Sequence, residues 1–252
     1  MIETTPIIDF HAHGGGWTNR AFPDDPNTYI KQMDITGVDT TCVNCIWFGD
    51  ANWANNLVFN RFVSKYPGRF IGVAFVTPHY PEECIYELDR AFNELNFKFL
   101  KLYPDYYGQS SDAEGYQPIY EWANDKGIPI MCHGRYGTDA PGTTQLKRYE
   151  KFTKDFPNIK WVIAHAGGGT DIDSVQTAKE LPNIWLETCG SGIGLRAVKH
   201  AVDYGLADKI LFGSDMPIMD YRNQISKVIT ADISNNDKKK ILGLNAIKLL
   251  NL

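Results

Sequence analysis

The 252-residue chain contains no apolar run near the roughly 18 residues that span a bilayer, so we expect no membrane segment. Residues 1–6 lack a basic segment and a long apolar segment, and no secretory signal is visible. Basic residues are in deficit, with 25 lysines and arginines against 30 acidic residues and a net charge of -5. Such a chain lacks the basic surface that phosphate backbones require, which argues against nucleic acid as a partner.

Cysteine is scarce and odd in number: Cys42, Cys45, Cys84, Cys132 and Cys189. Most lie within apolar runs, so we expect reduced core thiols in a cytoplasmic protein rather than a disulfide framework. The pair Cys42-x-x-Cys45 has a zinc-like spacing. It lies within a predicted strand, however, where residues three apart face opposite sides, so we interpret it as core.

The chain has no low-complexity stretch and no change of composition that would mark a domain boundary, so residues 1–252 are expected to form one domain. Short apolar runs alternate with amphipathic segments along its whole length, as at 51–66 and 83–95. The apolar runs have the length and composition of strands buried on both faces. They cover residues 6–13, 40–48, 70–76, 97–103, 129–133, 161–165, 184–188 and 210–215.

Eight strand-like runs, each followed by a helix-like segment, predict a single-domain (β/α)8 TIM barrel with an additional C-terminal helix. The alternative is an open, doubly wound sheet of the kind that binds dinucleotides. The Gly-rich stretch HGGGW at 13–17 lacks the G-x-G-x-x-G spacing of those proteins, which disfavours that alternative.

Ionisable side chains are concentrated where the predicted strands end, which is where such barrels build their active sites. His11 and His13 lie two apart on the first strand and therefore face the same side. His133, His165 and Asp215 end three other strands. Imidazole and carboxylate groups are ligands for zinc and similar divalent ions. Their convergence on one rim predicts a metal site.

Each of these residues also has a plain structural interpretation. A single histidine at a strand end is more often a hydrogen-bonded core residue than a ligand. Asp215, in the stretch GSDMP, could cap a helix instead of binding metal. A buried carboxylate without a partner is costly, however, and a metal would remove that cost. It is the convergence of five groups that favours the metal.

Lys101 ends the fourth predicted strand, and three interpretations of it stay open. It could be carbamylated and bridge two metals, or hold a substrate carboxylate or phosphate as an ammonium group. It could also pair with a neighbouring acid such as Asp105.

Other candidates for substrate contact lie in the loops above the rim. Arg135 could bind a carboxylate in bidentate fashion, although a plain surface arginine is as good an interpretation. His79 could also reach the mouth, whereas His200 lies in a helical pattern and is expected at the surface. An aromatic rim would suit a flat ligand, although ordinary packing explains many of its members. These aromatic residues are Trp17, Trp47, Tyr103, Tyr106 and Tyr107.

The stretches IDFHAH, LKLYP, PIMCHG, IAHAGG, FGSDMP and GLNAIKLL together resemble the amidohydrolase superfamily. They are most similar to its compact branch of aminocarboxymuconate-semialdehyde decarboxylase, resorcylate decarboxylases and pyrone-dicarboxylate lactonase. The resemblance covers essentially the whole chain. It departs at HGRYG, where a shorter His-Thr-Gly is more usual, so specificity does not transfer. TatD-like nucleases share the histidines but carry a strand-4 glutamate that is absent here.

The resemblance implies a divalent metal, usually zinc, held by His11, His13, His133 and Asp215. If the site holds one metal, the resemblance implies that His165 acts on the water or the substrate. If it holds two, the resemblance implies that His165 binds the second metal. Lys101 resembles the carbamylated bridging lysine of dihydroorotases. A site with one metal ion is favoured, and a site with two ions stays open as the alternative.

Three hypotheses for function follow, each with a small-molecule partner and with homo-oligomers left open. The first is hydrolysis of a small, carboxylate-bearing cyclic ester or amide by a metal-activated water, with Asp215 as proton acceptor and His165 orienting water or stabilising the oxyanion. The second is non-oxidative decarboxylation of an aromatic or unsaturated acid, suggested by Arg135 and the aromatic rim. The third is a barrel that binds metal or ligand without turnover.

Overall fold

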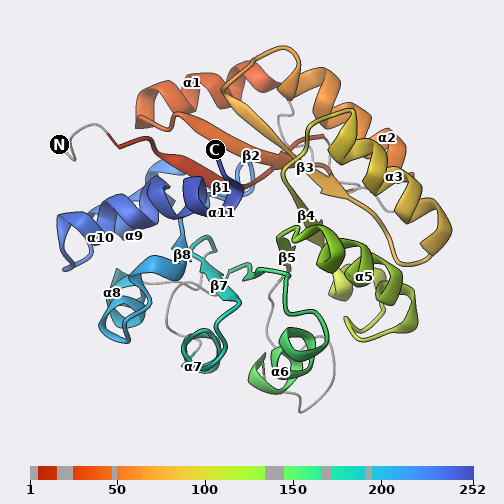
Figure 1. Ribbon diagram of the computed structural model, residues 1–252. Helices are drawn as coiled ribbons and strands as arrows, with labels where there is room; N and C mark the ends of the chain where they lie inside the picture. The colour runs from red at the N-terminus through yellow and green to blue at the C-terminus, as the bar shows by residue number, and fades with distance from the viewer. Residues whose placement is uncertain (1–4, 16–24, 47–49, 134–144, 166–171, 191–194) are drawn as a thin grey trace.

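A computed structural model describes residues 5–15, 25–46, 50–133, 145–165, 172–190 and 195–252 of the chain. It confirms the predicted barrel, since eight parallel strands follow one another in chain order, each paired with the next (Figure 1). The strands are β1 (Ile8–His13), β2 (Thr40–Asn44), β3 (Phe70–Phe75), β4 (Phe99–Leu102), β5 (Ile130–Cys132), β6 (Trp161–Ile163), β7 (Ile184–Glu187) and β8 (Ile210–Leu211).

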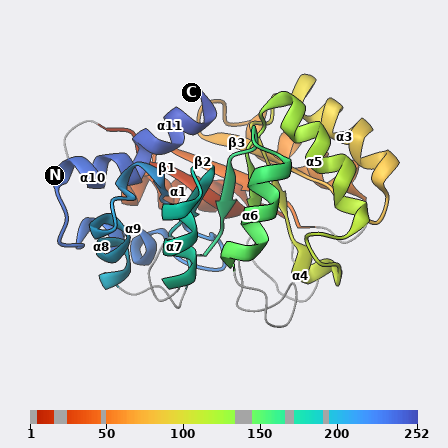
Figure 2. The same ribbon diagram turned by 60° about the horizontal axis from the view of Figure 1, so that its bottom comes forward.

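Helices surround the strands on the outside of the barrel (Figure 2). They are α1 (Pro26–Thr36), α2 (Ala51–Val58), α3 (Pro81–Asn93), α4 (Pro104–Tyr107), α5 (Gln117–Lys126), α6 (Gln145–Asp155), α7 (Ile172–Glu180), α8 (Leu195–Asp203), α9 (Tyr221–Ile229), α10 (Asn235–Lys239) and α11 (Asn245–Leu250). The sequence sets the ends of α1, because Asp25 accepts the Asn27 N–H and Gly37 takes a left-handed conformation after the last turn. The predicted helix at 51–66 consists of α2 and a π-helical turn, Phe59–Val63.

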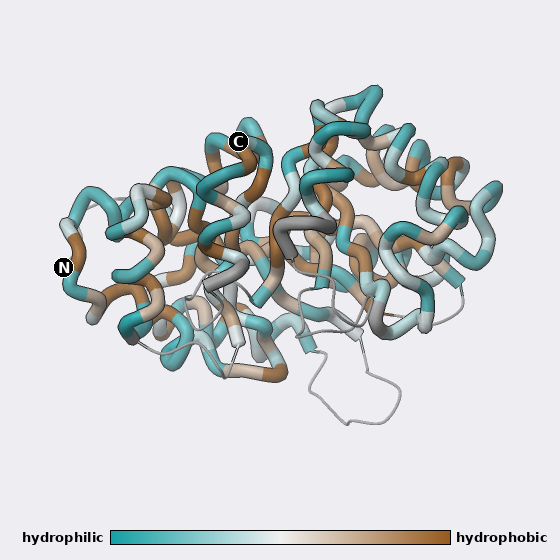
Figure 3. The backbone as a smooth tube through the Cα atoms, turned by 90° about the horizontal axis from the view of Figure 1, so that it is seen from below, coloured by the Kyte–Doolittle hydropathy of each residue, from teal (hydrophilic) through white to brown (hydrophobic). Residues whose placement is uncertain are grey.

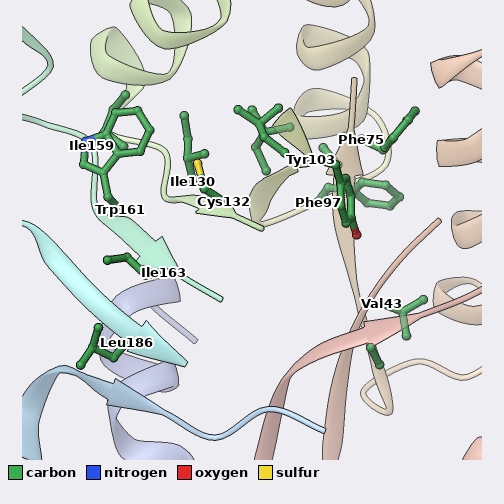
Figure 4. Close-up of a cluster of buried hydrophobic side chains, with 14 of the residues drawn as sticks. Val43, Phe75, Phe97, Tyr103, Ile130, Cys132, Ile159, Trp161, Ile163 and Leu186 are labelled. Atoms are coloured by element: carbon green, nitrogen blue, oxygen red, sulfur yellow. The ribbon is translucent and has the colours of Figure 1, made fainter. Parts of the chain in front are cut away.

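Two apolar layers hold the barrel together. One lies between strands and helices and includes Trp161 and Ile163 of β6, seen in Figure 4. The other fills the barrel interior, where Phe10 of β1 stacks on Phe99 of β4 with ring centroids 4.3 Å apart. Leu250 of the predicted C-terminal helix, α11, belongs to the same interior cluster, so this helix covers part of the barrel core. Figure 3 shows the outer loops mostly hydrophilic around the more hydrophobic strands.

The barrel closes through the segment that follows β8, not through β8 itself. The sequence predicted a strand at 210–215, but β8 ends at Leu211. Beyond it the chain continues beside β1, where Phe10 donates its N–H to the Phe212 carbonyl and His13 donates to Met216, at 2.8 and 2.7 Å. We call β1 together with residues 212–216 the seam.

All five cysteines are free and buried, as expected. In the described part of the chain, no helix is both long and apolar enough to cross a membrane.

Candidate metal centre and active site

The seam brings His11, His13 and Asp215 together from opposite ends of the sequence. The Asp215 N–H donates to the His11 carbonyl at 2.7 Å, so backbone pairing alone places these two residues side by side. The pairing of β1 with β2 shifts register between Asp9 and Ala12. Such irregularities re-aim side chains at the rims of barrels. The His11 and His13 rings consequently lie 5.0 Å apart.

The facing atoms of these three residues form a compact donor set. His13 Nε2 lies 2.8 Å, and His11 Nε2 3.8 Å, from Asp215 Oδ1. All three side chains are buried, and their ligand atoms lie within 4.8 Å of one another. Burial by itself would raise the pKa of Asp215, but the hydrogen bond from His13 and the nearby histidine charges lower it well below its usual range. Two imidazoles and an ionised carboxylate suit a zinc-type ion.

The backbone at Asp215 is left-handed, with φ of 61°, and a buried carboxylate holds it there. Asp9 accepts hydrogen bonds from the Ser214 N–H and hydroxyl, both at 2.7 Å, and from the His11 N–H at 3.1 Å. His165 has a similar φ of 58°. Left-handed conformations are strained for residues other than glycine and persist where the surroundings enforce them. The fold therefore accepts strain at two of the predicted site residues.

His165 and His133 lie on the same rim. The His165 ring centroid is 5.1 Å from that of His11 and 4.9 Å from that of His133. Burial lowers the pKa of His165 to about 4, so its imidazole is neutral near pH 7. Among the described residues, His133 is not one of the side chains whose ligand atoms group within 4.8 Å. Of the four predicted metal ligands, the structure thus brings three into direct reach and places the fourth beside His165.

Lys101 is fully buried at the centre of this rim. Its Nζ lies 3.2 Å from His11 Nε2, 3.1 Å from Met131 Sδ and 5.2 Å from the centre of the Tyr103 ring. Among the described residues it makes no hydrogen bond to a carboxylate, but the charges of Glu187 and Asp215 act on it. Burial lowers its pKa. The alternative pairing with Asp105 falls on a side chain outside the described residues.

Aromatic rings form a shelf beside the donor set. Tyr103 accepts a hydrogen bond from Asn44 at 2.6 Å, and its hydroxyl lies 3.4 Å from His13 Nδ1. Tyr106 stacks on Tyr103 at 5.6 Å and lies 4.8 Å from the His133 ring. We name Tyr103, Tyr106 and His133 the aromatic shelf.

The remaining residues considered for the rim lie in different environments. His79 is exposed and lies 3.0 Å from the Gln109 amide, and its ring is 6.0 Å from that of Tyr107. His200, expected at the surface, is half-buried with its ring 4.6 Å from that of Tyr204, which is itself exposed. Arg135, Trp17 and Trp47 lie outside the described residues.

The sequence analysis assigned no role to two residues that belong to the site. Glu187 lies near the end of the predicted strand at 184–188, and its Oε2 is 2.9 Å from His11 Nδ1. Cys189, interpreted as a core thiol, lies 3.2 Å from His11 Nδ1 and 3.1 Å from His165 Nδ1. A carboxylate ending an apolar strand was a usable signal for Glu187. Nothing in the sequence separated Cys189 from the other buried cysteines.

The chain matches one protein family, described as Amidohydrolase, over residues 8–252. No curated protein matches it significantly. Solved structures match it along nearly their full length, at identities that show the fold alone. 5-Carboxyvanillate decarboxylase from Sphingomonas paucimobilis has a TM-score of 0.74 and 16% identity, covering 99% of this chain and 100% of its own.

Two further structures show the same fold. A dihydroxybenzoic acid decarboxylase from Polaromonas sp. JS666, with bound manganese and an inhibitor, has a TM-score of 0.73 and 19% identity, covering 99% and 98%. 4-Oxalomesaconate hydratase from Rhodopseudomonas palustris has a TM-score of 0.73 and 22% identity, covering 97% and 95%.

Proposed function

Since the chain belongs to the amidohydrolase family of enzymes, we propose that it is a metal-dependent decarboxylase of a small aromatic or unsaturated carboxylic acid. The observation that carries this proposal is Lys101, a buried amine beside His11 that makes no hydrogen bond to a carboxylate among the described residues. Glu187 and Asp215 act on this amine through their charge, but burial still lowers its pKa, and a substrate carboxylate in direct contact would stabilise the ammonium form. We therefore assign Lys101 to binding the carboxylate.

His11, His13 and Asp215 would hold the metal, with His133 as the fourth ligand after a shift of its side chain. Zinc is the ion we expect, although one relative in fold carries manganese. When bound, the ion supplies a Lewis acid that polarises the carboxylate and an adjacent oxygen of the substrate.

The aromatic shelf would bind the flat part of the substrate. Tyr106 is half-buried and aligned with the rings of Tyr103 and His133, so a planar acid can pack beside it. Arg135 and Trp17 lie outside the described residues, and we propose that they complete this binding site. Decarboxylases and a hydratase among the structures of similar fold support an acid as substrate.

His165 is the residue we assign to proton transfer. In decarboxylation the bond between the carboxylate and its carbon breaks, carbon dioxide leaves, and that carbon receives a proton. Burial keeps His165 neutral in the free protein, and a bound anionic substrate beside it would raise its proton affinity. His165 would deliver this proton to carbon and regain one from water.

The test is a substrate panel on protein loaded separately with zinc and with manganese. We expect carbon dioxide release from a hydroxybenzoate- or muconate-like acid, and loss of that release in Lys101→Met through a raised KM. Turnover of lactones or amides with no release of carbon dioxide from any acid would contradict the proposal.

Hydrolysis is the second candidate function, and the ionised carboxylate of Asp215 favours it. Its lowered pKa keeps the carboxylate ionised and able to accept a proton from water beside the donor set. The same panel separates the two reactions, because only hydrolysis turns over esters or amides that lack a free carboxylate.

Metal stoichiometry decides between the two chemical states of Lys101. A lowered pKa leaves more of the amine neutral, and a neutral amine can take up carbon dioxide as a carbamate that bridges two metals. One equivalent of metal in bicarbonate buffer supports an ammonium that binds substrate. Two equivalents, falling to one in Lys101→Met, would instead support the carbamate.

A further inference from the structure

The carboxylate of Glu187 is completely buried at the end of β7 and gathers donors from three strand ends. Its Oε2 lies 2.9 Å from His11 Nδ1 and accepts the His165 N–H at 3.2 Å and the Cys189 thiol at 3.0 Å. Its Oε1 accepts the Cys189 N–H. In the described chain its only ion-pair partner is the His11 ring. Glu187 thus contacts residues that follow or form β1, β6 and β7.

These contacts fix which nitrogen of His11 carries the proton. Both Glu187 oxygens accept backbone N–H groups, so Nδ1 of His11 is the donor in its contact with Glu187. On the opposite side of the ring, Lys101 Nζ lies 3.2 Å from Nε2, and in its ammonium form it can only donate there. Both neighbours select the same tautomer, with a proton on Nδ1 and a free lone pair on Nε2. That lone pair is on the side of the ring that faces Asp215.

The segment after β8 leaves room for this carboxylate. A Cβ atom added at Gly213 would overlap Oε1, Cδ and Cγ of Glu187. The contacted group is a buried carboxylate with four hydrogen-bond donors, so it cannot move aside without losing them. Glycine is therefore required at this position of FGSDMP because any side chain would clash with Glu187.

We propose that Glu187 is a positioning residue that holds His11 in its metal-binding tautomer and orientation, with Gly213 providing the space. This inference rests on the metal site proposed above. Carboxylates that accept the second ring N–H of a metal-binding histidine orient the ring and make it a stronger ligand.

A second interpretation of the same group is a separate metal site. The ligand atoms of His11, His165, Glu187 and Cys189 lie within 4.8 Å of one another. Both Glu187 oxygens already accept hydrogen bonds, and His11 would have to release its Nδ1 proton. The contacts therefore favour positioning over ligation.

The first experiment measures zinc affinity by competition with a chromogenic chelator. We expect Glu187→Gln to bind zinc about 10- to 100-fold more weakly than the wild type. Glu87→Gln is the matched control, because Glu87 is also a buried glutamate but pairs with Arg90 on α3. Its affinity should stay at the wild-type value. Equal affinities in Glu187→Gln and wild type would overturn the proposal, whereas no zinc binding by the wild type would overturn the metal site itself.

A double-variant cycle tests the role of Gly213. Gly213→Ala should weaken zinc binding by displacing the Glu187 carboxylate. Added to Glu187→Gln, it should cause little further loss, because both changes act on one interaction. Fully additive losses would show that Gly213 acts independently and would remove it from the proposal.

Two measurements on wild-type protein keep the proposal testable if the variants do not fold. Nitrogen NMR of histidine-labelled, metal-free protein should show His11 protonated at Nδ1 and bare at Nε2; the opposite tautomer would overturn the proposal. Cobalt-substituted protein should show no thiolate-to-metal charge-transfer band. Such a band would make Cys189 a ligand and establish the separate site instead.

Discussion

The seam and the wall formed by β5 and β6 belong to one barrel but are stabilised in different ways. In the wall, Ile130, Trp161 and Ile163 pack among apolar side chains (Figure 4). In the seam, Asp9 and Asp215 are buried and each has named hydrogen-bond partners. Apolar packing tolerates many side chains of suitable volume, whereas a buried polar group requires a particular partner. The wall therefore provides stability, and the seam carries the proposed metal site at some cost in stability.

The largest expected effect lies in the seam. Asp215→Asn should reduce kcat/KM by at least about 10³-fold, the scale of removing one member of a catalytic set, because a neutral amide is a much weaker ligand for the proposed metal than a carboxylate. The fold should persist, since Asn accepts the left-handed conformation at this position. Activity assays and circular dichroism melting check both statements.

Asp220→Asn is the control for that change. Asp220 is a half-buried residue that caps α9 by accepting the Arg222 N–H, and Asn caps helices equally well; its ion pair with the Arg222 side chain is partly solvent-exposed and contributes little. Activity and melting temperature should match those of the wild type. An Asp215→Asn protein with full activity would refute the role of that residue.

The next effect lies in the wall. Trp161 is fully buried, stacks on Phe152 at 5.2 Å and meets Tyr120 edge-on at 5.1 Å. Trp161→Ala should lower the free energy of unfolding by about 3–5 kcal/mol. Urea denaturation measures this loss.

Zinc affinity at a temperature where the variant is folded should stay at the wild-type value. A large loss of affinity would show that wall and seam are coupled rather than stabilised independently.

The third effect is the dependence of stability on pH in metal-free protein. Burial lowers the pKa of His165 to about 4, below the 6.5 of an unfolded histidine. Between these values the unfolded chain binds a proton that the folded chain does not, so stability falls as pH falls from about 6.5 to 4. This histidine contributes up to about 3 kcal/mol to that fall. His165→Asn should lose that part of the dependence in denaturation at several pH values. An unchanged dependence would mean that other groups cause it.

The barrel was predictable from the sequence because the pattern that indicates it, an apolar run followed by a helix-like segment, occurs eight times. Each strand adds a short apolar run, and an error in one run does not change the fold. β8 illustrates the limit: its run was placed at 210–215, yet pairing as a strand ends at Leu211. Gly213 and the left-handed Asp215 change the course of the chain there, and the neighbours that impose this course come from β1 and β7.

The site was predictable where a residue type is chemically marked and lies at a strand end. His11, His13 and Asp215 met both conditions, and the structure brings them together. Glu187 met both as well, but its task depends on the side of the His11 ring that it contacts. That is a property of three-dimensional packing, which strand alternation does not specify.

The smallest expected effect is the difference in stability between two variants of His165, which measures the backbone strain at that position. His165→Gly and His165→Ala both remove the imidazole, but only glycine adopts a φ near 58° without strain. We expect the glycine variant to be more stable by about 1 kcal/mol, because the strain on alanine exceeds the entropy that glycine loses on folding. Thermal unfolding of the pair measures the difference.

The same two substitutions at His133, which is not among the residues with positive φ, provide the opposite case. There alanine should be the more stable by about 0.4–1 kcal/mol, since only the entropy of the unfolded chain distinguishes the variants. A reversal of sign between the two neighbouring histidines would show that the fold stores strain where His165 lies. The same sign at both would mean that the backbone at His165 relaxes once the imidazole is gone, so that the side chain enforces the conformation.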